Sequence, residues 1–416
     1  MPCAYDDFQE INLRLRRANS NPLAHWQISR LAHYIASTLN TPRPKIALTI
    51  DWFLPGTNSG GPVRSVANLS AALSEIDFYI ITRNTDYCST VPYEGIPANT
   101  WVQQEANVWV YYFSEDQLTK KKLKEVMKGV QSSTVYVSGI YSLAFSQWPV
   151  SIAKSLGSKT IIAARGMLSP HALAVKPMKK YLFLSFMRWI NAYAGVEFHA
   201  TSPEEAQDIR TVIGKRANVY VLPNVARQES TSVQEITKEK GSVKLVSIGR
   251  IAPEKGTLHG LQALQQVKGN VELDLYGTCY NTAYWEQCEQ LISQLPANIK
   301  VRYNGVCPTE EVTTKLAAAH ALLLPSEGEN YGHAIVESFG QGRPVLISKH
   351  TPWQELASQK AGWDVEFESL AQAISELAAM DQQTYNTWSE GAFHYHQKMI
   401  VLPFEENKKA YLRLLG

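Results

Sequence analysis

Short apolar runs alternate with longer segments of helical periodicity along most of the chain. Between the runs, apolar residues recur at helical spacing, as Val66, Leu69 and Leu73 do. Strands that alternate with helices are typical of parallel sheets covered by helices. The runs that we expect to form strands are residues 45–51, 78–82, 108–113, 134–137 and 160–164, and then 243–248, 271–276, 301–303, 321–324 and 344–348.

The alternation breaks at Pro223 and Asn224 and then starts again. Two successive series predict an α/β protein with two Rossmann-like domains that face each other across a cleft, over residues 45–222 and 223–388. Ligands in such sheets bind beyond the carboxyl ends of the strands. Residues 1–44 form a predicted helical extension without an assigned function, with one apolar face formed by Ile28, Leu31, Ile35 and Leu39.

Composition and charge narrow the classes of function. The 416 residues are enough for two domains, and no apolar run reaches the ~20 residues of a membrane span. The N-terminus lacks a secretory pattern and the five cysteines are scattered, so we expect a cytoplasmic protein. Residues 1–225 carry 23 Lys and Arg against 16 Asp and Glu, and the remainder 17 against 22. This excess of positive charge indicates either solvated helix faces or contact with an anionic membrane or acceptor. Nucleic acid fits poorly, because no basic stretch is interleaved with aromatic residues.

Two carboxylates bracket a predicted strand–loop–helix unit in residues 321–348. Glu329 lies in the loop, and Glu337 lies two turns into the helix that we expect from about residue 332 to 339. The N-terminus of a helix favours anions. A carboxylate can accept hydrogen bonds from hydroxyl groups, and the helix dipole can stabilise phosphates. A nucleotide-sugar carries both kinds of group and requires this combination.

Two further segments follow predicted strands. Gly60 and Gly61 stand where the first strand turns into a helix, and glycine there permits positive φ and close approach of a ligand. Arg250 and Lys255 flank the loop after the first strand of the second domain, five residues apart, so both can reach one diphosphate. A pair of glycines or a pair of cations in a loop is common in proteins, so neither is specific by itself. The glycines also do not form the GxGxxG fingerprint of dinucleotide-binding enzymes.

Together with the two glutamates, four segments in chain order resemble the retaining glycosyltransferases of family 4, also called glycosyl transferases group 1, which have the GT-B fold. The spacing of Glu329 and Glu337 matches that family's pair of glutamates separated by seven residues. The resemblance covers most of the chain and implies that a C-terminal helix, within residues 389–416, crosses back to the first domain. The four segments are residues 59–64 (SGGPVR), 165–171 (RGMLSPH), 222–224 (LPN) and 249–256 (GRIAPEKG).

The resemblance assigns roles to individual residues. It implies that Glu329 contacts the transferred sugar and that Glu337 holds the ribose hydroxyls. Arg250 and Lys255 would neutralise the departing diphosphate, and His171 would face the sugar. It also implies that the nucleotide-sugar is bound by Gly60, Gly61, Asn330, Tyr331 and Gly332. On the acceptor side we expect Arg165 and Tyr141, each also compatible with a structural role. His333 departs from the family's commonest residue, so it tunes sugar choice or caps the helix.

The predicted reaction moves a sugar from a UDP- or GDP-sugar to a hydroxyl of a glycan or lipid-linked acceptor, with retention of configuration. The resemblance points to bacterial cell-surface polysaccharide assembly, on the inner face of the cytoplasmic membrane. The sequence contains no DxD motif and no spacing typical of metal ligands, so we expect neither metal nor cofactor. A catalytically silent binding or scaffold protein and a nucleotide-sugar epimerase stay open as alternatives. The sequence does not reveal the base of the nucleotide, the sugar, the acceptor or the oligomeric state.

Overall fold

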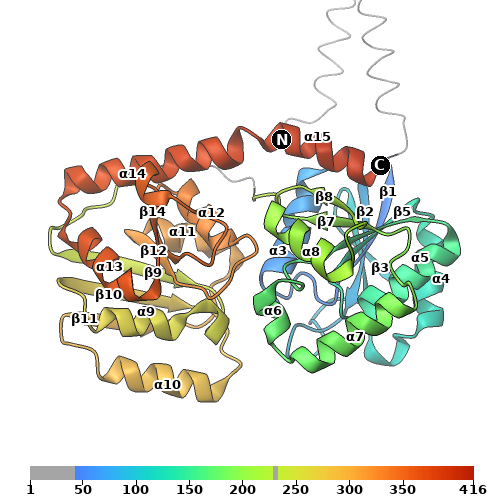
Figure 1. The fold of residues 1–416 in the computed structure, drawn as a ribbon, viewed down its shortest axis with the longest axis horizontal. Helices are drawn as coiled ribbons and strands as arrows, with labels where there is room; N and C mark the ends of the chain where they lie inside the picture. The colour runs from blue at the N-terminus through green and yellow to red at the C-terminus, as the bar shows by residue number, and fades with distance from the viewer. Residues whose placement is uncertain (1–42, 228–232) are drawn as a thin grey trace, which may run out of the picture. The chain divides into compact units, whose positions relative to one another are not determined.

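The computed structural model describes residues 43–227 and 233–416, so the helix expected around Ile28 lies outside the described residues. Residues from Lys45 onward form one compact unit, which contains two sheets (Figure 1). The first sheet has the order β3-β4-β2-β1-β5-β6-β7-β8, and only β3 runs antiparallel to its neighbour. Its strands are β1 (Lys45–Thr49), β2 (Asp77–Arg83), β3 (Trp101–Glu105), β4 (Val108–Phe113), β5 (Thr134–Ser138), β6 (Lys159–Ala163), β7 (Glu197–Ala200) and β8 (Asn218–Val221).

Helices cover both faces of the first sheet because its central strands are apolar on both sides. In β1, Ile46 and Leu48 belong to one core cluster and Ala47 to the other. The first cluster includes α3 and the second includes α4, α5, α7 and α8. The helices of this domain are α3 (Gly61–Ala72), α4 (Lys120–Val130), α5 (Trp148–Leu156), α6 (Pro170–Ala174), α7 (Pro177–Trp189) and α8 (Pro203–Ile213).

The second sheet is parallel throughout, in the order β11-β10-β9-β12-β13-β14. Its strands are β9 (Ser242–Ile248), β10 (Asn270–Tyr276), β11 (Ile299–Tyr303), β12 (Ala321–Leu324), β13 (Val345–Ser348) and β14 (Gly362–Val365). The helices packed on it are α9 (Thr257–Leu264), α10 (Thr282–Ser293), α11 (Val312–Ala317), α12 (His333–Gly340), α13 (Leu370–Ala379) and α14 (Gln382–His396).

Strand order places the functional loops. In the first sheet β1 lies between β2 and β5, and in the second sheet β9 lies between β10 and β12. The order of connection reverses at β1 and at β9, and such switch points open a crevice beyond the carboxyl ends of the strands. The glycine loop follows β1 and the loop from Arg250 to Lys255 follows β9. The fold therefore brings both motifs to the positions where a ligand is expected.

The C-terminal segment connects the two domains. Helix α14 packs on α12 of the second domain, and α15 (Phe404–Leu415) follows after a short π-helical stretch at Gln397–Val401. Tyr411 and Leu415 of α15 are buried in the core cluster that contains β1. The two Rossmann-like domains and the returning helix agree with the predicted fold class. Tyr395 and Ile400 still pack against the second domain, and α15 is the helix that reaches the first domain.

Each strand predicted from the apolar pattern is present, with ends shifted by at most two residues. Four strands were not predicted, namely β3, β7, β8 and β14. Three of these lie at the sheet edges, where one side is exposed, so their sequences are short and mixed rather than continuously apolar. Within the described part of the chain, no helix combines the length and hydrophobicity needed to cross a bilayer.

Candidate active site

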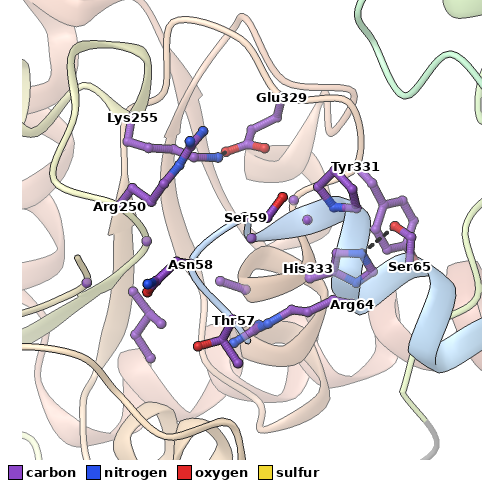
Figure 2. A pocket seen from close by; sticks show the side chains of 18 of the residues that line it. Thr57, Asn58, Ser59, Arg64, Ser65, Arg250, Lys255, Glu329, Tyr331 and His333 are labelled. Atoms are coloured by element: carbon purple, nitrogen blue, oxygen red, sulfur yellow. Dashed lines mark hydrogen bonds and ion pairs between the residues drawn. The ribbon is translucent and has the colours of Figure 1, made fainter. Parts of the chain in front are cut away.

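A pocket of about 300 Å³ lies at the carboxyl ends of β1 and β9 and is lined by both domains (Figure 2). The first domain contributes the glycine loop and the start of α3, and the second contributes the loop after β9 and the start of α12. Of the predicted site residues, the pocket brings together Gly60, Gly61, Arg165, Arg250, Lys255, Glu329, Asn330, Tyr331 and Gly332.

The glycine loop lines the pocket with the backbone of Gly60 and Gly61, next to the side chains of Thr57, Asn58 and Ser59 (Figure 2). Gly60 caps α3 with φ 74° and ψ −128°, and no side chain caps the helix. A methyl group on Gly60 or Gly61 would meet no atom within 4 Å, so the space above both is open. Asp86 fixes the approach to this loop, because its Oδ2 accepts from the peptide N–H groups of Thr57 at 3.1 Å and Asn58 at 3.3 Å. The uncapped N–H groups of α3 suit an anion.

The second domain supplies paired charges. Lys255 Nζ lies 2.5 Å from Glu329 Oε1, which also accepts from Ser326 Oγ at 3.0 Å. Arg250 Nη2 lies 3.0 Å from Glu254 Oε1. Each pairing holds a cation in place while engaging only part of its donors, since an ammonium has three N–H donors and a guanidinium five. Both cations are therefore positioned to reach a further anion in the pocket.

Gly256 sets the position of Lys255. It has φ 68°, and a Cβ there would lie 1.8 Å from the carbonyl oxygen of Pro325. The chain after Lys255 thus touches the chain that leaves β12 for Glu329. This close approach requires glycine and explains why the cation and the carboxylate meet although they are 74 residues apart.

The start of α12 forms the third side of the pocket. Gly332 caps the helix with φ 76° and again without a capping side chain. The carbonyl oxygen of Tyr331 accepts from Trp353 Nε1 at 2.6 Å, which fixes the loop before the helix. Positive potential from the helix dipole is strongest within the first turn, so a negative group near Asn330 to Gly332 is stabilised.

His333 joins this helix to the first domain. Its Nε2 lies 3.0 Å from Ser65 Oγ of α3. Burial lowers the pKa of His333 to about 3, with smaller contributions from the nearby cations Arg64, Arg165 and Lys255. The imidazole is therefore neutral near pH 7 and acts as a hydrogen-bonding group rather than as a positive charge.

Glu337 lies outside this pocket. Both of its oxygens accept from Arg64 Nη1, at 3.2 Å for Oε1 and 3.0 Å for Oε2. It lines a small neighbouring hollow together with His333 and Val336. The pairing with Arg64 was not foreseen, because sequence does not show that the first turn of α3 and the second turn of α12 approach each other.

Arg165 lines the pocket but is already engaged. Its Nη1 donates to Asn224 Oδ1, and its Nη2 donates to the hydroxyl of Tyr136 at 3.1 Å. Tyr136 OH lies 2.6 Å from His199 Nδ1. His199 Nε2 lies 2.8 Å from the carbonyl oxygen of Leu222. This buried network ties the pocket to the interdomain linker, so Arg165 holds the linker in place.

Two predicted residues are not among those that line the pocket. His171 stands in α6 at its rim, half exposed, with Nε2 3.9 Å from Glu327 Oε2. Tyr141 donates to the carbonyl oxygen of Met167 at 3.2 Å, and its ring packs edge-on against Phe183. The structure thus places Tyr141 in a packing role within the first domain.

Several lining residues carried no signal in the sequence. They follow the carboxyl ends of β10 and β11, beside the cations, and are mostly small or apolar. Only their position after predicted strands marks them as candidates. They are Tyr276, Gly277, Thr278, Val306, Cys307 and Thr309. Across residues 43–227 and 233–416, no three side chains of His, Cys, Asp or Glu are arranged to hold a metal ion.

Comparison with known proteins agrees with this geometry. Residues 228–394, which span most of the second domain, match the family model of Glycosyl transferases group 1. The chain is also 25% identical over 130 residues to the 2-deoxystreptamine glucosyltransferase of Streptomyces kanamyceticus. That match covers 30% of this chain and 34% of the relative, about a third of its length.

Solved structures share the fold. Sucrose-phosphate synthase of Thermosynechococcus elongatus superposes with a TM-score of 0.68 at 17% identity, over 89% of this chain and 98% of that one. HepE of Anabaena, solved with UDP and glucose, superposes with a TM-score of 0.64 at 15% identity, over 90% of this chain and 100% of that one. TarM of S. aureus, solved with UDP, superposes with a TM-score of 0.63 at 11% identity, over 90% of this chain and 100% of that one. The protein therefore has the GT-B fold of glycosyltransferases, as predicted.

Proposed function

We propose that the chain is a retaining glycosyltransferase of family 4. It transfers a sugar from a UDP- or GDP-sugar to a hydroxyl group, without a metal ion. The single observation that supports this most strongly is the pocket in which Arg250, Lys255 and Glu329 meet the uncapped starts of α3 and α12. Two cations, two helix N-termini and one carboxylate match the charges of a diphosphate attached to a sugar.

In the proposed reaction the bond between the anomeric carbon and the diphosphate oxygen breaks first. Negative charge grows on the diphosphate and is stabilised by Arg250, Lys255 and the peptide N–H groups of the two helix starts. Positive charge grows on the sugar ring and is stabilised by the Glu329 carboxylate. The acceptor oxygen then bonds to the same face of the anomeric carbon, and its proton passes to the departing phosphate oxygen.

The remaining contacts follow the resemblance to the family. Glu337 holds the ribose hydroxyls while Arg64 keeps its carboxylate oriented, since a carboxylate accepts about four hydrogen bonds. His171, at the rim, approaches the sugar from the first domain. The acceptor is a glycan or a lipid-linked hydroxyl in the assembly of bacterial cell-surface polysaccharide, and the enzyme works at the inner face of the cytoplasmic membrane.

A panel of UDP- and GDP-sugars, measured by thermal shift, tests donor binding. A matching donor stabilises the protein by about 2.7 kcal/mol at a hundredfold excess over Kd. Release of the nucleoside diphosphate, followed with wild type and Glu329→Ala, then tests catalysis. A donor that binds but is never cleaved would establish the silent alternative, and conversion of the sugar without release of the nucleotide would establish the epimerase. Binding of no nucleotide-sugar would contradict the proposal.

A further inference from the structure

Helix α7 of the first domain is apolar on two faces, although only one face is packed. Leu184 and Met187 are buried in the domain core. The opposite face carries an outer stripe, which we define as Met178, Tyr181, Leu182, Phe186 and Trp189, with exposed fractions between 53% and 81%. The stripe follows helical spacing along the whole helix, so it is one continuous surface. Large exposed apolar patches mark sites of interaction.

The segment of sequence that contains this stripe is charged with one sign only. Residues 166–196 contain no Asp or Glu, whereas they contain Lys176, Lys179, Lys180 and Arg188. Lys176 and Lys179 are exposed at the start of α7. Lys180 donates to the carbonyl oxygen of Ala172, and Arg188 donates to carbonyl oxygens at the end of α8. The first two lysines therefore extend the stripe with mobile positive charge.

We propose that the outer stripe of α7 is a surface that binds an anionic phospholipid bilayer. A helix that lies in the membrane interface typically combines Trp, Phe and Leu on one face with Lys at its flanks, and Trp and Tyr favour the level of the headgroups. A second copy of the chain fits less well, because residues 166–196 contain no Asp or Glu to pair with the lysines of another copy and because Lys is depleted at protein interfaces.

This surface also suggests how a lipid-borne acceptor reaches the pocket. Helix α6 precedes α7 and packs beside it on the first domain (Figure 1). The bond from Lys180 to Ala172 holds the two together, and α6 carries His171 at the rim of the pocket. A bilayer under α7 thus presents its headgroups next to the proposed acceptor side. This consequence rests on the proposed function, whereas bilayer binding itself does not.

Sedimentation of the full-length chain with vesicles tests the surface. We expect the wild type to bind vesicles of mixed phosphatidylcholine and phosphatidylglycerol more tightly than vesicles of phosphatidylcholine alone. The stripe variant Leu182→Gln/Phe186→Gln/Trp189→Gln should lose binding to both. Lys176→Gln/Lys179→Gln should weaken binding to the anionic vesicles about 30-fold, since each lysine near such a surface contributes about fivefold.

Matched controls separate this effect from a general change in polarity or charge. Leu402→Gln removes an exposed leucine, and Lys268→Gln/Lys300→Gln removes two exposed lysines of the second domain. Both should bind vesicles like the wild type. Binding of the stripe variant equal to the wild type would overturn the proposal, and so would absence of vesicle binding by the wild type. If gel filtration instead shows a dimer that only the stripe variant dissociates, while vesicle binding is unchanged, the face is a self-interface.

Thermal shift with the best UDP- or GDP-sugar, measured on the same variants, keeps the two proposals distinguishable. The stripe and lysine variants should retain the donor-induced shift of the wild type. A retained shift without vesicle binding would refute the membrane surface alone. Stripe-dependent vesicle binding without any donor-induced shift would refute the proposed transferase alone.

Discussion

The two domains contribute to the pocket in different ways. The second domain supplies charged side chains, and each cation is held by a carboxylate of its own domain, as in the pair of Lys255 and Glu329. The first domain supplies backbone at Gly60 and Gly61 and two cations that are engaged elsewhere, Arg64 by Glu337 of the second domain and Arg165 by Asn224 and Tyr136. The comparison teaches that the second domain positions its cations with its own carboxylates, whereas the cations of the first domain are held by the linker and by the other domain. Each domain also contributes one helix start.

Loss of a cation from the second domain should have the largest effect. In the proposed reaction, Lys255→Ala removes an ammonium that stabilises charge on the departing diphosphate, so kcat should fall about 10²–10³-fold. Steady-state release of the nucleoside diphosphate measures this. Lys268→Ala, which removes an exposed lysine of the same domain, should leave kcat unchanged. Equal turnover of Lys255→Ala and wild type would contradict the role of the second domain in the reaction.

Substitution in the glycine loop should act on stability through the backbone. Gly60 has φ 74° and ψ −128°, a conformation that side chains rarely adopt, so Gly60→Ala should lower the free energy of unfolding by about 1–3 kcal/mol. Gly61 is the matched control, because it stands in the first turn of α3 with ordinary φ and open space. Urea unfolding compares the two variants. Equal stability would show that the loop conformation is not a constraint.

The contact between the domains predicts a pH dependence of stability. Burial lowers the pKa of His333 from 6.5 to about 3. The unfolded chain therefore binds a proton that the folded chain excludes, so this contribution to stability is complete above pH 6.5 and is lost as pH falls toward 3. His333→Gln should flatten the slope of unfolding free energy in this range, by at most about 1.4 kcal/mol per pH unit.

Urea unfolding at a series of pH values measures that slope. His394 is exposed, so His394→Gln is the control and should follow the wild type. His199 has its pKa lowered to about 3 by burial as well, which means that a residual slope is expected in His333→Gln. Identical slopes for His333→Gln and wild type would place the imidazole in solvent and weaken the contact with Ser65.

The smallest effect is expected where α15 holds the linker. Tyr411 OH donates to the carbonyl oxygen of Pro223 at 2.9 Å and lies 3.1 Å from His199 Nε2. Tyr411→Phe keeps the packing and removes these bonds, so unfolding should cost about 1 kcal/mol less. Tyr181→Phe, on the exposed face of α7, should change nothing in the same urea titration. No difference between the two variants would argue against a structural role for the network.

The difference between the domains also explains what the sequence could predict. The meeting of Arg250, Lys255 and Glu329 in one pocket was predictable, because all three stand in loops that follow apolar strands. The pairing of Glu337 with Arg64 was not, since it depends on the approach of two helices that are 273 residues apart. The hydrogen bond between Arg165 and Asn224 of the linker could not be predicted either, because it also depends on how distant segments approach each other.

The sequence also did not reveal which residues are buried in α7 and in the strands at the sheet edges. Leu182 and Leu184 are the same residue type two positions apart, and only the fold shows that the first is exposed and the second buried. The strands β3, β8 and β14 lie at edges and have mixed sequences, so the apolar pattern that revealed the central strands gave no signal there.

The central claim is that side-chain cations and helix dipoles, without a divalent ion, stabilise the departing diphosphate. Release of UDP or GDP from the donor identified by thermal shift, measured with and without EDTA, tests it most directly. The account predicts the same rate in both conditions, and a loss of about 10²–10³-fold in Lys255→Ala either way. A rate that EDTA abolishes and manganese or magnesium restores would contradict it.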